Sequence, residues 1–190
     1  MPEKQIEIVH KSDLPRKSET EQSAFFDEVL QRSLIAEARA GVVDHFFDVA
    51  ETVVRIVFAG DNLARLLVPA LSHLEIAPSP SPDVTFHVWD SRSTGVAMAG
   101  PPCALAALTD RGEIWGMDSA RIRSAFHWFE YSVNLMNTGT NTGIYWVRMQ
   151  TRCLTGRRRR RSGLCFTGGW NAIAASCSTP PGSAMTAAAS

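Results

Sequence analysis

The sequence predicts one α+β domain with a mixed or antiparallel sheet and two main helices, followed by an irregular or disordered C-terminal tail. Three observations lead to this prediction. Apolar residues recur at helical spacing in two segments, they alternate at strand spacing in several others, and the last part of the chain shows neither period. Because the predicted helices precede a series that is mostly strands, α+β is favoured over a regular α/β alternation.

The first half of the chain contains both predicted helices. Residues 1–20 are polar and mixed in charge, and are expected to be a flexible lead. A helix is predicted over 21–40, where apolar residues recur on one face and Gly41 follows as a stop. The β-branched, alternating segment 52–59 predicts a strand, and the leucine-rich segment 62–74 predicts the second helix. The following PSPSPD stretch predicts an extended connector.

The second half reads mainly as strands and turns. Alternation over 84–91 predicts a strand, and segments 103–109 and 113–118 predict a hairpin across a polar turn. A short helix is predicted over 119–123, capped by its first serine. The stretch NTGTNTG predicts a turn, and residues 144–149 predict a last strand.

The charge of the chain is unevenly distributed. Up to Thr151, 13 Lys and Arg stand against 19 Asp and Glu, a net charge of −6, and the remaining residues add six Arg and no acidic residue. We expect residues 21–148 to fold and residues 149–190 to be a disordered tail. The arginine run 157–161 would suit nucleic-acid phosphates, but neither stacking aromatics nor a folded element accompanies it. No specific nucleic-acid partner is therefore predicted.

No pattern predicts a catalytic, cofactor-binding or metal site. Three of the four cysteines lie in the tail without a CxxC pair or paired histidines, which argues against a zinc site. The histidines form no i,i+4 ligand pair, and surface or satisfied core positions are expected for them. They are His10, His45, His73, His87 and His127. The carboxylates near the predicted strands are isolated and indicate no dyad; they are Asp90, Asp110, Asp118 and Glu130. The NTGTNTG stretch lacks the lysine of a phosphate-binding loop.

The sequence also bears on location. No apolar run approaches the roughly 20 residues that cross a bilayer, so no membrane association is predicted. The polar N-terminus lacks the apolar region of a signal peptide. A cytoplasmic location of bacterial type is therefore expected.

Seven short motifs follow one another along the body. They are TVVRIVFAG, LVPALSHLE, PDVTFHVWD, PPC, GEIWGMDS, FEYSVNLMN and IYWVRM. This series, over roughly residues 45–148, resembles the bacterial HPr serine kinase-like proteins, relatives of HPr kinase/phosphorylase and of the phosphoenolpyruvate carboxykinase type of P-loop fold. In that family the motifs precede the nucleotide site. The resemblance implies that an intact relative uses ATP and Mg²⁺ to phosphorylate a protein serine.

The tail departs from the pattern of this family. The family's chain would continue with a segment similar to LPYYERGAPLRAILHWWM, a QLLHAAAVG-like strand and a P-loop, none of which is present here. If a base was lost or gained near codon 150, the tail codons permit LPYW, ALLHWWM and QLLHAAG with the same spacing. We therefore expect residues 149–190 to be out of frame, and the five arginines to be a by-product of that shift.

Two functions follow as expectations. The first is an N-terminal fragment of an HPr kinase-like, ATP-dependent protein serine kinase, which lacks the P-loop, holds no cofactor and is inactive as written. The alternative is a stand-alone protein-binding or regulatory module without catalytic activity. A downstream P-loop in the intact frame would favour the first function, and a neighbouring gene for a dedicated partner would favour the second.

A truncated kinase would expose apolar side chains that the missing part covers, and such side chains favour association. We expect them in the aromatic stretch and in the last strand. This aromatic stretch lacks nearby lysine, so base stacking is not expected. The candidate residues for binding a protein partner or a second copy are Phe126, Trp128, Phe129, Tyr131, Ile144 and Trp146.

Overall fold

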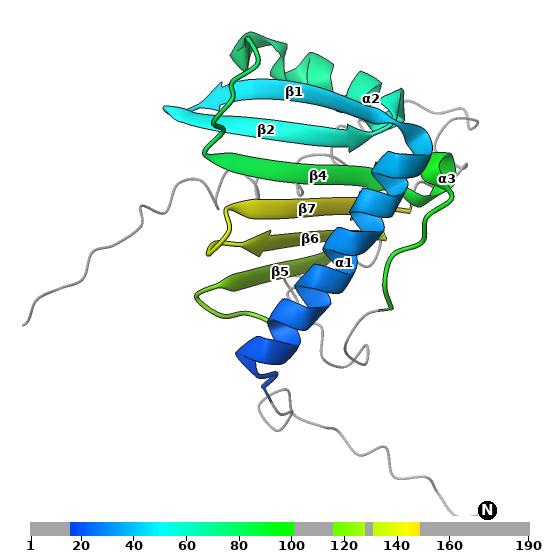
Figure 1. The fold of residues 1–190 in the computed structure, drawn as a ribbon, viewed down its shortest axis with the longest axis vertical. Coiled ribbons are helices and arrows are strands. Elements are labelled where there is room, and N and C mark those ends of the chain that lie inside the picture. The colour runs from blue at the N-terminus through cyan, green and yellow to red at the C-terminus, as the bar shows by residue number, and fades with distance from the viewer. Residues whose placement is uncertain (1–15, 101–115, 128–130, 149–190) are drawn as a thin grey trace, which may run out of the picture.

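The computed structural model describes residues 16–100, 116–127 and 131–148, which form a seven-stranded mixed sheet with a helix on each face (Figure 1). The predicted α+β class, with two main helices, is confirmed. The tail at 149–190 and most of the predicted lead lie outside the described residues. The elements are α1 (Glu19–Ala40), β1 (Val42–Val49), β2 (Thr52–Ala59), α2 (Asp61–Leu71), the 3₁₀ turn η2 (Ser72–Leu74), β3 (Glu75–Ile76), β4 (Val84–Asp90), α3 (Ser91–Thr94), β5 (Ile122–His127), β6 (Ser132–Asn137) and β7 (Thr142–Val147).

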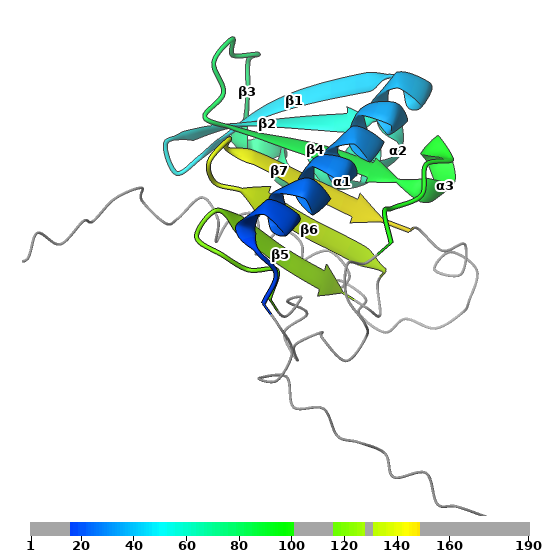
Figure 2. The same cartoon turned by 60° about the horizontal axis from the view of Figure 1, so that its bottom comes forward.

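The strand order across the sheet is β3-β1-β2-β4-β7-β6-β5. The three central strands β2, β4 and β7 are parallel to one another. All the remaining neighbouring pairs are antiparallel. Figure 2 shows the twist of this sheet, with α1 crossing one face diagonally. The carboxyl ends of the three parallel strands therefore meet at one edge of the sheet.

Helix α1 begins two residues earlier than predicted because Ser18 caps it. The Ser18 hydroxyl accepts a hydrogen bond from the Glu21 N–H, and the Glu21 carboxylate accepts one from the Ser18 N–H. This reciprocal pair satisfies two backbone donors at the helix start. The hydrogen bond from the Ser18 backbone is also the main reason why the pKa of Glu21 lies below its usual value. Gly41 ends the helix, as predicted, with a φ of 83°.

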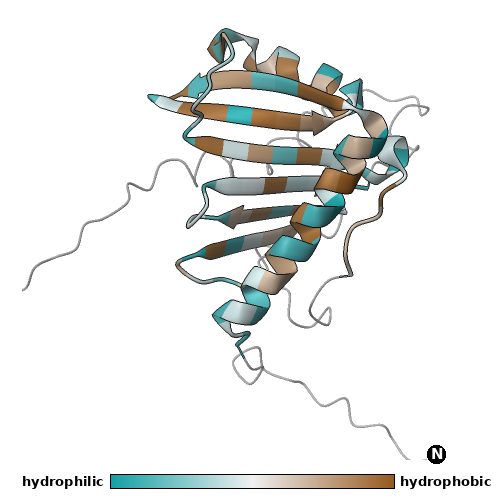
Figure 3. Cartoon of the chain, in the orientation of Figure 1, coloured by the Kyte–Doolittle hydropathy of each residue, from teal (hydrophilic) through white to brown (hydrophobic). Residues whose placement is uncertain are grey.

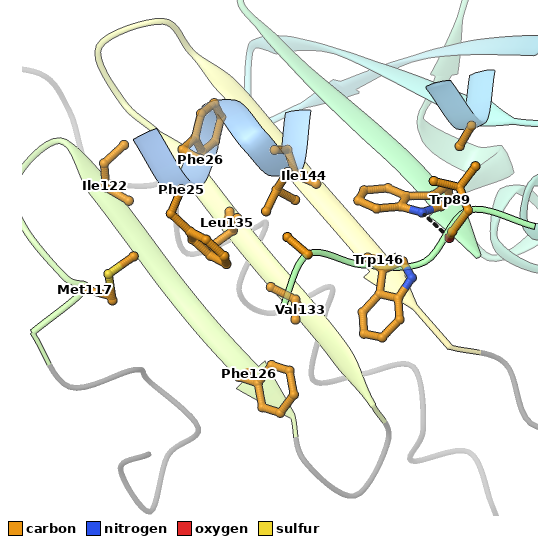
Figure 4. Close-up of a cluster of buried hydrophobic side chains, with 14 of the residues drawn as sticks. Phe25, Phe26, Trp89, Met117, Ile122, Phe126, Val133, Leu135, Ile144 and Trp146 are labelled. Carbon is orange, nitrogen blue, oxygen red and sulfur yellow. Dashed lines mark hydrogen bonds between the residues drawn. The ribbon is translucent and has the colours of Figure 1, made fainter. Parts of the chain in front are cut away.

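The two faces of the sheet carry two separate apolar cores. Successive residues of a strand point to opposite faces, so β2, β4, β6 and β7 each contribute to both cores. In Figure 3 apolar positions recur along α1 and along the strands behind it. The core under α1 joins Phe25, Phe26 and Val29 to side chains of β4, β5, β6 and β7 (Figure 4). The core under α2 joins Leu63, Ala64 and Leu71 to side chains of β1, β2, β4, β6 and β7.

The hairpin of β1 and β2 was only half predicted. The sequence predicted β2 but no strand over 42–49, and the eight-residue β1 pairs with β2 along its whole length. Its two-residue turn consists of Ala50 and Glu51, with φ values of 51° and 67°. Such turns usually carry Asn-Gly or Asp-Gly, because those residues adopt positive φ at little cost. With neither residue type present, the local sequence gave no hairpin signal.

The predicted helix over 119–123 is wrong. Residues from Ile122 onward form the strand β5, which pairs with β6. Ser119 was predicted to cap this helix. Its hydroxyl does accept a hydrogen bond from the backbone three residues on, the Ile122 N–H at 3.0 Å, but no helix follows. Pairing with β6 buries Ile122 completely, and this long-range gain outweighs a weak local preference.

The remaining predicted elements have mixed outcomes. The strand at 84–91 is β4 and the last strand is β7, while NTGTNTG forms the turn between β6 and β7, as predicted. The second helix ends at Leu71, three residues early, and continues as the 3₁₀ turn. No regular element occurs in the PSPSPD connector. Most of the hairpin predicted over 103–118 lies outside the described residues, and its last residues, 116–118, form no strand.

Candidate functional site

The predicted association surface is largely buried. Phe126 is 8% exposed, Ile144 is 1% exposed and Trp146 is 7% exposed, and all three belong to the core beneath α1. The prediction that they are uncovered is wrong, because α1 lies across this face (Figure 4). Tyr131 is half-buried, with the Arg148 guanidinium 5.4 Å from its ring centroid. Trp128 and Phe129 lie outside the described residues.

A buried polar pair joins α1 to the centre of the sheet. His87 of β4 lies between Val57 and Ile144 of the neighbouring strands, and its Nδ1 lies 2.7 Å from Glu37 Oε1 on α1. Only 15% of the His87 side chain and 10% of the Glu37 side chain are exposed. The expected satisfied core position of this histidine is confirmed. The contact between the His87 ring and the Glu37 carboxylate fixes α1 to the centre of the sheet.

Removing this pair should weaken the fold. Glu37→Ala leaves a buried imidazole without its partner, so we expect a loss of about 1–3 kcal/mol in the free energy of unfolding. The matched control is Glu28→Ala in the same helix, because Glu28 pairs with Arg32 at 3.0 Å on the surface. The control should cost about 0.5 kcal/mol or less. Urea unfolding measures both values, and equal losses would contradict the structural role of His87–Glu37.

A second polar group lies at the carboxyl edge of the parallel strands. Asp90 ends β4 and is fully buried, and it accepts hydrogen bonds from Asn62 Nδ2 at 3.0 Å and from Ser93 N–H and Oγ–H at 2.7 and 2.5 Å. It thus caps α3 and ties the start of α2 to β4. With three donors the carboxylate is satisfied, so this isolated carboxylate has a structural role.

An open cavity of about 500 Å³ is lined in part by Asn62 and Ser93, the two residues that donate to Asp90. It is formed by the end of α1, the start of β1, the start of α2 and Ser93. Ligands of open α/β sheets commonly bind at this edge. Here, however, Asp61 is paired with Arg65, and no Lys or Arg is among the described residues that line the cavity, so it offers no cation to a phosphate.

The third group lies on the face of the sheet opposite α1. Ser132 and Asn134 of β6 point there, alternating with Val133 and Leu135 of the α1 core. Ser132 is 1% exposed and Asn134 is 8% exposed. No motif marks these residues as a site, although the polar-apolar alternation of SVNLMN was a signal for a strand with a polar side.

The hydrogen bonds of this group are incomplete. The Ser132 hydroxyl, both amide atoms of Asn134 and Nε2 of His127 are buried without a hydrogen-bond partner in the described part of the chain. His127 is the register partner of Ser132, so the three residues share one face of β5 and β6. We call Ser132, Asn134 and His127 the β6 polar cluster.

Other site chemistry is sparse. Among the described residues, no three His, Cys, Asp or Glu side chains are grouped closely enough to hold a metal ion. Within those same residues no helix is long and apolar enough to cross a membrane. The isolated Asp118 pairs with Arg123 at 3.1 Å, and His45 pairs with Glu75 at 2.7 Å, so both have surface partners. Asp110, Glu130 and His10 lie outside the described ranges.

Comparison of the chain with protein-family models, with curated proteins and with solved structures found no match.

Proposed function

We propose that this chain carries the N-terminal part of a bacterial, cytoplasmic HPr kinase-like protein serine kinase, and that the chain as written is inactive. One observation supports this best. Four of the motifs that resemble the HPr kinase-like proteins lie on successive elements of one folded unit. They are TVVRIVFAG on β2, LVPALSHLE at the end of α2, PDVTFHVWD on β4 and IYWVRM on β7. Three of these motifs lie on the adjacent parallel strands β2, β4 and β7, and the fourth lies on the helix that follows β2, as shared ancestry of one domain would explain.

The described residues do not fit ATP and Mg²⁺. Phosphoryl transfer depends on backbone amides around the phosphates, a lysine on the β and γ oxygens, and oxygen ligands for Mg²⁺. Lys17 is the one lysine in the described ranges, and it precedes α1, where its Nζ lies 3.5 Å from Glu21. The glycine-containing turn at 138–141 joins β6 to β7 and is followed by a strand, whereas a P-loop is followed by a helix. No catalytic step is therefore assigned to this chain.

ATP binding tests this proposal. The chain as written should show no saturable binding of Mg-ATP in isothermal titration at about 0.15 M salt, where weak attraction to the arginine run is screened. Restoring the reading frame near residue 150 and extending the chain through the downstream P-loop should create micromolar binding.

A control separates the body from the tail. Saturable binding that survives deletion of residues 152–190 would reveal a nucleotide site in the body and overturn the inactive assignment. An intact frame without any P-loop would remove the kinase proposal altogether.

A second function is favoured by one feature of the surface. Large apolar side chains are exposed near the carboxyl end of α1, with Leu34 at 40%, Ile35 at 46% and Val42 at 52%. Exposed apolar groups of this kind suit a protein-binding or regulatory module. The protein-binding or regulatory function is favoured if the gene with its reading frame restored encodes no nucleotide-binding site.

A further inference from the structure

The outer face of α1 is largely apolar over the last turns of the helix. Its exposed residues recur at intervals of three or four and therefore share one face; they are Gln31, Leu34, Ile35 and Ala38. A helix that packs one face against a sheet usually presents polar side chains on the other. We call Leu34, Ile35 and Ala38 the α1 stripe.

The α1 stripe is uncovered in the described part of the chain. In Figures 1 and 2, α1 is the outermost of the described elements on its side of the sheet. Leu34 is 40% exposed and Ile35 is 46% exposed, whereas Val29 on the inner face of the helix is fully buried. Exposed apolar side chains that lie together favour contact with another protein surface.

Two charged residues of opposite sign border the α1 stripe. Glu28 precedes the stripe and Arg39 follows it, and because they are separated by about three helical turns they lie on the same side of α1. Glu28 is 54% exposed and accepts a hydrogen bond from Arg32 through Oε1 at 3.0 Å. Arg39 donates to the Gly95 carbonyl from Nη1 at 3.4 Å. A carboxylate has a second oxygen and a guanidinium has further N–H groups, so both residues can also bond a partner.

A second copy of α1 matches this arrangement when the two helices run antiparallel. In a two-fold dimer each contact occurs twice, because the same patch serves both copies. With the axis midway between Glu28 and Arg39, each Glu28 faces the partner subunit's Arg39. The two Leu34 side chains then meet near the axis, with Ile35 beside them. A parallel, in-register arrangement would instead bring like charges together.

We propose that the outer face of α1 is the interface of a two-fold, antiparallel homodimer, with Leu34 and Ile35 at its centre and Glu28 paired with the partner subunit's Arg39 at each end. The inference does not depend on the kinase proposal, since every residue involved lies in the described body. The contact spans about three helical turns, roughly 16 Å. Small interfaces of this kind form weak dimers, so we expect a dissociation constant in the micromolar range.

The mass of the chain in solution tests the apolar centre of the interface. In sedimentation and light scattering, the average mass of the 190-residue chain should rise from one copy towards two between about 5 and 200 µM. Leu34→Glu should keep the chain monomeric over this range, because it brings two carboxylates together at the axis. A chain that is monomeric without any substitution would overturn the proposal, and so would a dimer that Leu34→Glu leaves intact.

The matched control is Leu66→Glu on α2. Leu66 is 53% exposed, so it is at least as accessible as Leu34, but it belongs to the helix on the opposite face of the sheet. Both substitutions replace an exposed leucine, and circular dichroism should show that both variants stay folded. Leu66→Glu should leave dimer formation unchanged. If it disrupts the dimer as strongly as Leu34→Glu, the interface does not lie on α1.

Charge reversal tests the antiparallel geometry. Glu28→Arg and Arg39→Glu should each weaken self-association at least about tenfold, because each dimer then contains two pairs of like charge. An equal mixture of these two variants should form a mixed dimer about as tightly as the original chain, since both pairs again have opposite charges. Loss of the Glu28 contact with Arg32 does not account for such a recovery, because the Glu28→Arg chain lacks that contact in the mixture as well.

The mixture also separates this dimer from other kinds of association. Recovery in the mixture requires that residue 28 of one copy meets residue 39 of the other, which an unrelated apolar contact does not provide. If the mixture stays as weakly associated as the single variants, α1 pairs in another orientation and the proposal is wrong. Mg-ATP binding tests the kinase proposal separately, so the failure of either proposal is recognised independently of the other.

Discussion

Replacing Gly143 with alanine is expected to destabilise the fold by about 3 kcal/mol or more. A Cβ at Gly143 in β7 would lie 2.0 Å from Cε1 and 2.1 Å from Cδ1 of Phe86, its register partner in β4. The Phe86 ring is 3% exposed and packed in the core under α2, so it has little room to move. Elsewhere a glycine-to-alanine change in a compatible conformation stabilises slightly, which makes the sign of this effect informative. Urea unfolding monitored by circular dichroism measures it.

Two controls isolate the clash. Gly100→Ala should change stability by no more than about 0.5 kcal/mol, because a Cβ there meets no atom within 4 Å. In a Phe86→Ala background the cost of Gly143→Ala should largely disappear, since the colliding ring is gone. A loss that persists in that background would show that the backbone of β7, rather than Phe86, resists the substitution.

Replacing Trp89 with alanine is expected to lower the free energy of unfolding by about 3–5 kcal/mol. The indole is fully buried in the core under α1, and its N–H donates to the Val96 carbonyl at 3.3 Å (Figure 4). Alanine removes the whole ring and leaves a cavity between β4 and α1. Thermal and urea unfolding should both report this loss.

The comparison variant is Trp89→Phe. Phenylalanine keeps most of the buried area but loses the indole N–H, while the Val96 carbonyl still accepts a hydrogen bond from Ser91 Oγ–H at 2.8 Å. We therefore expect this variant to lose about 1–2 kcal/mol in the free energy of unfolding. If Trp89→Ala and Trp89→Phe lower the free energy of unfolding by the same amount, packing of the ring does not stabilise the fold. That result would contradict the burial of Trp89 in the core under α1.

The sequence by itself determined the elements whose signal is local. Helix α1 carries its own cap at Ser18 and its own stop at Gly41, and the strands β2, β4 and β7 alternate over enough residues to be recognised. The α+β class followed from these elements alone. The motifs that resemble the kinase family lie on the same elements, so the functional proposal was also available from the sequence.

Only the tertiary structure decided which strands pair and what the sheet buries. The strand β1 depends on pairing with β2 through a turn of unfavourable residues, and β5 depends on pairing with β6. The contact between Glu37 and His87 joins residues 50 positions apart. Such pairings gain their free energy from residues distant in sequence, and a local window does not contain that information.

The candidate site shows the same division. The last strands suggested an exposed surface, but Ile144 and Trp146 are buried in the core under α1. Ser132 and Asn134 were visible in the sequence as polar residues of SVNLMN, yet their lack of hydrogen bonds is a property of the assembled sheet. The sequence determines which side chains alternate along a strand. Packing determines which side of that strand is buried, because burial depends on the helix that crosses it.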